Sequence, residues 1–205
     1  MFYKLVYTLL VLIMKPLYRF KIIGKHNIPK TGPVIIAPNH MSYLDPIMVA
    51  FVARPRPVNF MGKASLLKIP GFGKVLKALH TFPVNRGTVD KGAIVQSLKI
   101  LSKGEVLLIF PEGTRHREGK LGKPFPGVSS IALKTGATIV PVGIIGTDKV
   151  LPDGSKLPRF PKLKAIIGEP IRVEKVATAD RKEKEAALTA RVIGEIESLI
   201  AGGKR

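Results

Sequence analysis

The chain has 205 residues, which is enough for one domain with a substantial core and too few for two ordinary domains. Its formal net charge of +20 predicts an anionic partner, either nucleic acid or the surface of an acidic membrane, while a hydrophobic content of 45% excludes a disordered chain. The sequence contains no cysteine, which excludes disulfides, thiolate metal ligands and a cysteine nucleophile.

The N-terminal segment has a run of ten largely apolar residues between Lys4 and Lys15, about half the length that a helix needs to cross a bilayer. Residues 15–19 follow where a signal peptide would have small residues at a cleavage site, so we expect the segment to be retained. Residues 1–20 are predicted to form an amphipathic helix at the membrane interface, with tyrosines and basic side chains near the headgroups. The alternative is a helix packed on its own domain.

Beyond residue 20, predicted strands and helices alternate, and residues 21–201 are expected to form a single domain followed by a tail at 202–205. This order predicts an α/β fold with a largely parallel central sheet and helices on both faces. The first strand is expected at an edge of the sheet, and Pro141 suggests an edge or a bulge for its own strand. The predicted strands are 20–24, 34–37, 58–61, 81–84, 105–110, 138–145 and 163–167, and the predicted helices are 46–52, 64–68, 73–79, 88–102, 127–135 and 180–201.

Residues 37–46 place a histidine and an aspartate five positions apart between a predicted strand and a predicted helix. On an ideal helix such residues point about 140° apart, so they meet only if His40 lies in the turn and Asp45 near the helix start. Pro46 is suited to the first helical position, which predicts Asp45 as the N-cap. The simplest interpretation of these residues is a capped helix preceded by a surface histidine.

Several polar residues directly follow the ends of predicted strands. In a parallel sheet the functional groups gather at the carboxyl ends of the strands, so these residues are expected to share one edge. They are His40, Lys63, Arg86, Glu112 and Arg115.

His40 with Asp45 is a candidate general base, because a carboxylate on one ring nitrogen fixes the tautomer and stabilises the cation that forms. The simplest reaction is direct attack by a substrate hydroxyl on an activated acyl carbon. Ser42 is an alternative nucleophile, although no G-x-S-x-G elbow surrounds it.

Lys63, Arg86 and Arg115 suggest a phosphorylated acceptor, because guanidinium groups bind phosphate in a bidentate way. The alternative is that they are ordinary surface charges of a very basic protein. Glu112 can orient an arginine or bind the acceptor, or it can be an ordinary acid at a helix start. The histidines lack metal-ligand spacing, and neither a metal nor a cofactor is expected.

Four blocks in this order resemble the glycerolipid acyltransferase family, particularly its 1-acylglycerol-3-phosphate acyltransferase branch. H-x-x-x-x-D alone is a weak signal, and joined to F-P-E-G-T-R it is a strong one. The resemblance covers about residues 34–146. The blocks are H-x-x-x-x-D at 40–45, F-P-V-N-R-G at 82–87, F-P-E-G-T-R at 110–115 and I-V-P-V at 139–142.

The resemblance implies that His40 is the catalytic base and that Asp45 assists it. It also implies that an acyl-CoA or acyl-carrier-protein thioester is the donor and a membrane-bound lysophospholipid the acceptor. Pro141 is expected near the acyl chain. The residues implied in binding the acceptor phosphate are Arg86, Glu112, Gly113, Thr114 and Arg115, with Lys63 at a basic position common in that branch.

The expected function is therefore acylation of the free hydroxyl of 1-acylglycerol 3-phosphate, giving phosphatidate for phospholipid biosynthesis, by a peripheral or monotopic protein on the cytoplasmic face of a membrane. One alternative keeps the chemistry and changes the acceptor to glycerol 3-phosphate, a lyso-ornithine lipid or a glycolipid. Another is a basic protein that binds nucleic acid or anionic lipid without catalysis. The low aromatic content and the four blocks disfavour it, and no nucleic-acid partner is expected.

Overall fold

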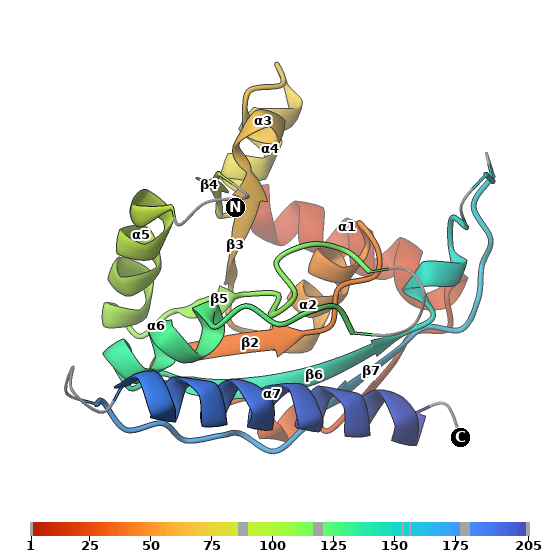
Figure 1. Ribbon diagram of the computed structural model, residues 1–205. Coiled ribbons are helices and arrows are strands. Elements are labelled where there is room, and N and C mark those ends of the chain that lie inside the picture. The colour runs from red at the N-terminus through yellow and green to blue at the C-terminus, as the bar shows by residue number, and fades with distance from the viewer. Residues whose placement is uncertain are drawn as a thin grey trace.

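The computed structural model describes residues 2–85, 90–116, 121–152, 154–155, 157–176 and 181–203, with the backbone alone for residues 2–7, 10 and 11. Its centre is a seven-stranded sheet in the order β1-β7-β6-β2-β5-β3-β4 (Figure 1), in which all neighbouring pairs are parallel except β6 with β7. The prediction of a largely parallel sheet is confirmed. The strands are β1 (Lys21–Ile23), β2 (Val34–Pro38), β3 (Val58–Lys63), β4 (Thr81–Val84), β5 (Val106–Leu108), β6 (Thr138–Ile145) and β7 (Lys164–Ile167).

Helices cover both faces of the sheet, because its central strands are apolar on both sides. Along β2, Val34 and Ile36 pack into one hydrophobic cluster together with α2 (Asp45–Ala53). Ile35 belongs to the cluster on the opposite face, with α5 (Lys91–Ser102), α6 (Gly127–Thr135) and α7 (Arg181–Gly203) (Figure 1). The strand that leads to His40 is therefore fully buried and fixed from both sides.

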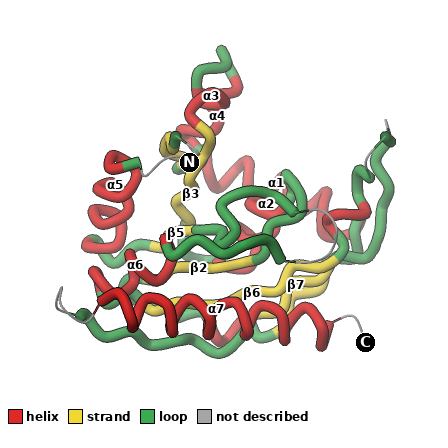
Figure 2. The backbone as a smooth tube through the Cα atoms, in the orientation of Figure 1, coloured by secondary structure: helices red, strands yellow, loops and turns green. Residues whose placement is uncertain are grey.

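Two short helices, α3 (Ala64–Leu67) and α4 (Phe72–Ala78), lie between β3 and β4 and form a hairpin that projects away from the sheet (Figure 2). Gly73 makes the close approach of the two helices possible, because a Cβ there would collide with the Leu67 carbonyl. The remaining short elements are the 3-10 helices η1 (Lys25–Asn27) and η2 (Thr147–Lys149).

Asp90 begins α5 as its N-cap, with one carboxylate oxygen accepting the Ala93 N–H at 2.9 Å and the other accepting the Asn85 N–H at 2.8 Å. The Asn85 and Ala93 N–H groups hold the pKa of Asp90 below its usual value, since they stabilise the charged form. The described helix begins three residues after the predicted start at residue 88, which lies outside the described ranges.

Pro141 was expected to mark an edge or a bulge, and the edge position is wrong, because β6 lies between β7 and β2. Pro141 is opposite Ala37 of β2, and its carbonyl accepts the Gly168 N–H at 2.9 Å, just past the last residue of β7. The pairing of β6 with β7 stops at Val142 and Ile167 and resumes as a bridge between Ile139 and Ile171, so the partner segment has one extra residue at this point, as in a bulge. The missing N–H of the proline therefore falls where the ladder is already interrupted. The prediction of an edge position for residues 20–24 is confirmed, since β1 is terminal in the sheet.

The first helix, α1 (Phe2–Leu17), joins the domain at its C-terminal end, where Met14 is buried in the core next to Tyr18 and Phe20. Its remaining described apolar side chains are exposed by 41% to 68%. No helix in the described ranges combines the length and apolar character needed to cross a membrane. The exposed set is Leu9, Leu12, Ile13 and Leu17.

Candidate active site

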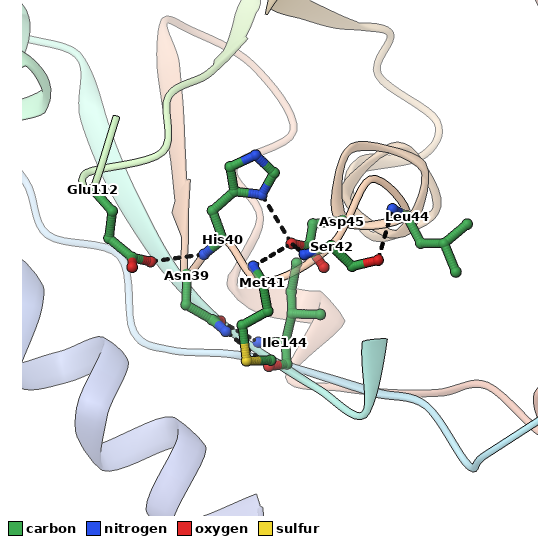
Figure 3. A network of polar contacts seen from close by, with 8 residues as sticks. All are labelled: Asn39, His40, Met41, Ser42, Leu44, Asp45, Glu112 and Ile144. Atoms are coloured by element: carbon green, nitrogen blue, oxygen red, sulfur yellow. Dashed lines mark hydrogen bonds and ion pairs between the residues drawn. The ribbon is translucent and has the colours of Figure 1, made fainter. Parts of the chain in front are cut away.

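The turn between β2 and α2 brings the His40 and Asp45 side chains together, as the sequence predicts. His40 Nδ1 lies 2.9 Å from Asp45 Oδ2, and both residues are buried (Figure 3). The other ring nitrogen, Nε2, points away from this network (Figure 3). A carboxylate at Nδ1 favours the tautomer in which Nδ1 carries the hydrogen and Nε2 keeps its lone pair.

Asp45 is not the N-cap of α2, which corrects the expectation from the sequence. The helix begins at Asp45 itself, and Leu44 occupies the cap position without a side-chain bond. The carboxylate turns back instead of forward, because Oδ2 accepts the backbone N–H groups of Met41 and Ser42, each at 2.7 Å. Oδ1 is buried and has no hydrogen-bond partner in the described ranges. One oxygen thus fixes both the turn and the imidazole.

The backbone of His40 is also held, by the segment that follows β5. Glu112 Oε1 accepts the His40 N–H at 2.7 Å, and the His116 N–H donates to the His40 carbonyl at 2.9 Å. Glu112 Oε2 accepts the Gly122 N–H at 2.8 Å, and the side chain is buried. Both oxygens of this carboxylate are therefore engaged by backbone groups, which makes Glu112 a support for His40.

Asn39 ties the same turn to β6. Its side-chain oxygen accepts the Ile144 N–H at 2.7 Å and its amide donates to the Ile144 carbonyl at 3.0 Å, in a buried position (Figure 3). The Asn39 side chain thus bonds to the backbone of β6 as a neighbouring strand would. These two bonds fix the direction in which the chain leaves β2. The sequence signal for this contact was only an asparagine next to the histidine.

Phe110 lies face to face with the His40 ring, with ring centroids 3.7 Å apart and an interplanar angle of 13°. The face of an aromatic ring stabilises a neighbouring cation, so this stack suits an imidazole that takes up a proton. Phe110 also lines a groove of about 660 Å³ between the ends of β3, β4 and β5 and the segment before α6. The groove is lined by Pro46, Phe60, Met61, Val84, Asn85, Leu108, Ile109, Phe110, Gly113, Thr114, Phe125, Gly127 and Val128.

Arg115 lies beside the His40 turn, with its guanidinium 3.6 Å from the centroid of the Tyr43 ring and Nη2 donating to the Tyr43 hydroxyl at 2.9 Å. Its Nη1 is buried and has no partner in the described ranges. Arg115 therefore brings a guanidinium, the group that binds phosphate in a bidentate way, next to the turn that carries His40.

The other residues implied in phosphate binding are distributed differently. Gly113 and Thr114 line the groove, and Lys63 is the exposed last residue of β3. Arg86 lies outside the described residues. Pro141 lies in β6 and does not line the groove, so its place near an acyl chain stays a prediction.

The alternative nucleophile, Ser42, gains no support. Ser42 Oγ accepts the Leu44 N–H at 3.3 Å, and no hydrogen bond in the described ranges joins it to His40. Across the same ranges, no group of three or more His, Cys, Asp or Glu side chains is placed to hold a metal ion.

Reasoning from the sequence missed Asn39, Tyr43, Phe110 and the apolar lining of the groove. Phe110 is part of the F-P-E-G-T-R block, but the sequence does not show its contact with His40, because the two residues are far apart in the chain. The groove residues are ordinary hydrophobic residues of strands and gave no signal of their own.

His40 is held at Nδ1, at its backbone and on the face of its ring, so Nε2 can accept a proton without rearrangement of the side chain. The fold and the site are thus those of an α/β protein suited to proton transfer by a histidine. Residues 19–145 match the family model described as Acyltransferase, and the chain belongs to this family.

Relatives of known name agree with this assignment. The chain is 32% identical to the 1-acyl-sn-glycerol-3-phosphate acyltransferase of Bacillus subtilis over 179 residues, covering 87% of each protein. It is 32% identical to a chloroplastic 1-acyl-sn-glycerol-3-phosphate acyltransferase of Arabidopsis thaliana over 78% of this chain, and spans about half (46%) of that longer protein. The crystal structure of the 1-acyl-sn-glycerophosphate acyltransferase of Thermotoga maritima is similar with a TM-score of 0.74 at 26% identity, over 96% of this chain and 80% of the other.

Proposed function

We propose that the protein transfers a fatty acyl group from an acyl-CoA or acyl-carrier-protein thioester to the free hydroxyl of 1-acylglycerol 3-phosphate, giving phosphatidate for phospholipid biosynthesis. The names of the relatives that match most of the chain support this acceptor. The observation that carries the proposal is the hydrogen bond between His40 Nδ1 and Asp45 Oδ2, which leaves Nε2 to act on a hydroxyl.

His40 acts as the general base and Asp45 orients it. The acceptor oxygen bonds to the thioester carbonyl carbon while its proton passes to His40 Nε2. The bond between carbon and sulfur then breaks, and the departing thiolate takes the proton from the imidazolium. No covalent enzyme intermediate is needed. Because Asp45 Oδ2 is itself held by the two backbone N–H groups, the base is in place before the substrates arrive.

Arg115 binds the acceptor phosphate through its guanidinium, and Tyr43 holds that group beside the turn. Gly113 and Thr114 belong to the same segment as Arg115, and Lys63 and Arg86 are the further basic residues that we propose for phosphate binding. Both carboxylate oxygens of Glu112 already accept backbone N–H groups, so Glu112 holds the His40 backbone in place and does not bind the phosphate.

The acyl chain of the donor lies in the groove beside Phe110. Its lining is mainly apolar and includes the Phe110 ring that stacks on His40, which brings a chain bound there close to the base. The exposed leucines and isoleucine of α1 support a peripheral position at the membrane surface, with the helix lying in the interface. We place the protein on the cytoplasmic face.

Purified protein in detergent, given an acyl thioester and a panel of acceptors, tests the proposal. The panel contains 1-acylglycerol 3-phosphate, glycerol 3-phosphate, a lyso-ornithine lipid and a lysoglycolipid. We expect the first to be acylated fastest. His40→Ala should lower kcat by roughly 10²- to 10⁴-fold, the usual contribution of a general base. His26→Ala changes an exposed histidine of η1 and should leave kcat unchanged.

Acyl transfer that persists at the normal rate in His40→Ala would contradict the mechanism. A clear preference for another acceptor would keep the mechanism and overturn the substrate. Both CoA and acyl-carrier-protein thioesters are supplied, and the ratio of their kcat/KM values identifies the donor.

A further inference from the structure

The hairpin of α3 and α4 presents an apolar tip to solvent. We call residues 68–77 the hairpin tip. Three of its large apolar side chains, Ile69, Phe72 and Val75, are exposed by 46%, 49% and 38%. Apolar side chains gathered at one protruding point are not explained by the core, because the hairpin projects away from the sheet (Figure 1).

The charge around the tip is of one sign. Lys68, Lys74 and Lys77 lie among the apolar side chains, and residues 63–79 contain no aspartate or glutamate. All three lysines are exposed. This combination of apolar side chains ringed by lysines matches an anionic bilayer, into which the apolar groups insert while the lysines meet the headgroups.

The tip is held in shape by its own backbone. The Phe72 N–H donates to the Pro70 carbonyl and the Gly73 N–H to the Ile69 carbonyl, each at 2.8 Å. Gly71 has a positive φ of 73°, and Gly73 lies against the Leu67 backbone with no room for a Cβ. Ile69 and Phe72 therefore remain exposed at a fixed turn and cannot pack back on the domain.

We propose that the hairpin tip is a second membrane-contact site, which inserts Ile69 and Phe72 into the headgroup boundary of an anionic bilayer. A bilayer is favoured over a protein partner because the surface is convex and projecting, a shape that enters a fluid interface and offers a folded partner little area. The proposal extends the proposed function, but it rests on exposure, charge and backbone geometry that no step of the reaction requires.

The hairpin also connects two of the strands that line the groove beside Phe110. It leaves β3 after Lys63 and returns at the start of β4, and these strands supply Met61 and Val84 to the groove. Insertion of the tip would bring this end of the groove to the bilayer, from which the lipid acceptor comes.

Tryptophan fluorescence tests the contact directly, because the chain contains no tryptophan. Phe72→Trp in the full chain places a single probe at the tip, and Val95→Trp places a matched probe on α5, where Val95 is exposed by 64%. With vesicles of phosphatidylglycerol and phosphatidylcholine at low salt, we expect a blue shift and quenching by brominated lipid for Phe72→Trp and neither for Val95→Trp.

A paired substitution measures how much the tip contributes to binding. Ile69→Ser with Phe72→Ser should lower vesicle partitioning roughly tenfold, since two apolar side chains no longer leave water, whereas Val95→Ser should not. Both variants change exposed side chains, and circular dichroism checks that the fold is kept. These measurements involve no acyl transfer, so they can fail while the proposed function stands.

Two results would overturn the proposal. One is Phe72→Trp emission that vesicles leave unchanged. The other is an emission change with an acidic protein, for which acyl carrier protein is the probe, without any change on vesicles; that result would make the hairpin tip a protein-docking surface.

Discussion

Phe110 separates two regions of the site that are built in different ways. On one side, His40 and Asp45 are buried and bonded to each other, and the turn that carries them is held by the Glu112 carboxylate and by the bonds of its own Asn39 to β6. On the other side, the groove is lined mainly by apolar side chains, and the hairpin above it exposes such side chains to solvent. Proton transfer requires fixed positions, whereas an acyl chain requires only space and apolar walls. The two regions should therefore respond to substitution in different kinetic parameters.

Asp45→Asn should have the largest effect, a fall in kcat of roughly 10²- to 10⁴-fold with little change in the KM of either substrate. An amide oxygen in the place of Oδ2 lacks the negative charge that stabilises the imidazolium, and its NH2 group would occupy the buried position of Oδ1, where no acceptor is described. Steady-state kinetics with 1-acylglycerol 3-phosphate provides the measurement, and Asp148→Asn in η2 is the control. A kcat within about threefold of the unchanged protein would remove Asp45 from the mechanism.

Glu112→Gln should have an intermediate effect. Glutamine has one accepting oxygen, so it cannot accept both the His40 N–H and the Gly122 N–H. We expect the free energy of unfolding to fall by about 1–3 kcal/mol, because a buried donor loses its partner. We also expect kcat to fall about tenfold as the base loses support.

Denaturant unfolding and steady-state kinetics of Glu112→Gln together distinguish a residue that supports His40 from one that binds the acceptor phosphate. If Glu112 bound the acceptor, the KM for the acceptor would rise while stability stayed the same. That pattern would contradict the supporting role assigned by the two hydrogen bonds.

Met61→Trp should have the smallest effect on activity, and this effect should be confined to binding of the acyl chain in the groove. The larger ring fills part of the groove, so kcat/KM should fall about fourfold for each donor methylene that no longer fits, as expected from about 0.8 kcal/mol per methylene. Short-chain donors should react normally. Assays with a series of donor chain lengths test this, with Val95→Trp as the control. An equal loss for all chain lengths would argue against the groove as the acyl site.

The order of strands and helices was accessible from the sequence because apolar periodicity and turn residues are local signals. The meeting of His40 with Asp45 was also accessible, since only five positions separate them. The role of Asp45 as a cap was wrong, because the preceding backbone N–H groups compete for the same carboxylate. Of the two expectations for Pro141 only the edge position was wrong, because a proline is also tolerated inside a sheet where the regular pairing with a neighbouring strand is interrupted.

The supports of the site were not accessible in this way. Asn39 and Ile144 are 105 positions apart and His40 and Glu112 are 72 apart, so their contacts exist only once the sheet has formed. The resemblance to the acyltransferase blocks drew attention to Glu112, but no sequence pattern states which groups its oxygens meet. The groove has the same limitation, because it is defined by the space between elements and not by unusual residues.

The connection between α1 and β1 has a mechanical consequence. Only residues 18–20 separate them, and this segment is not a free linker. Tyr18 and Phe20 are buried, the Tyr18 carbonyl accepts the Leu163 N–H, and the Lys21 N–H donates to the Leu163 carbonyl, both at 3.0 Å. The orientation of α1 relative to the sheet is thus fixed by these contacts. Whatever plane α1 adopts on a surface also sets the tilt of the whole domain, so the angle at which His40 faces that surface is determined by the fold.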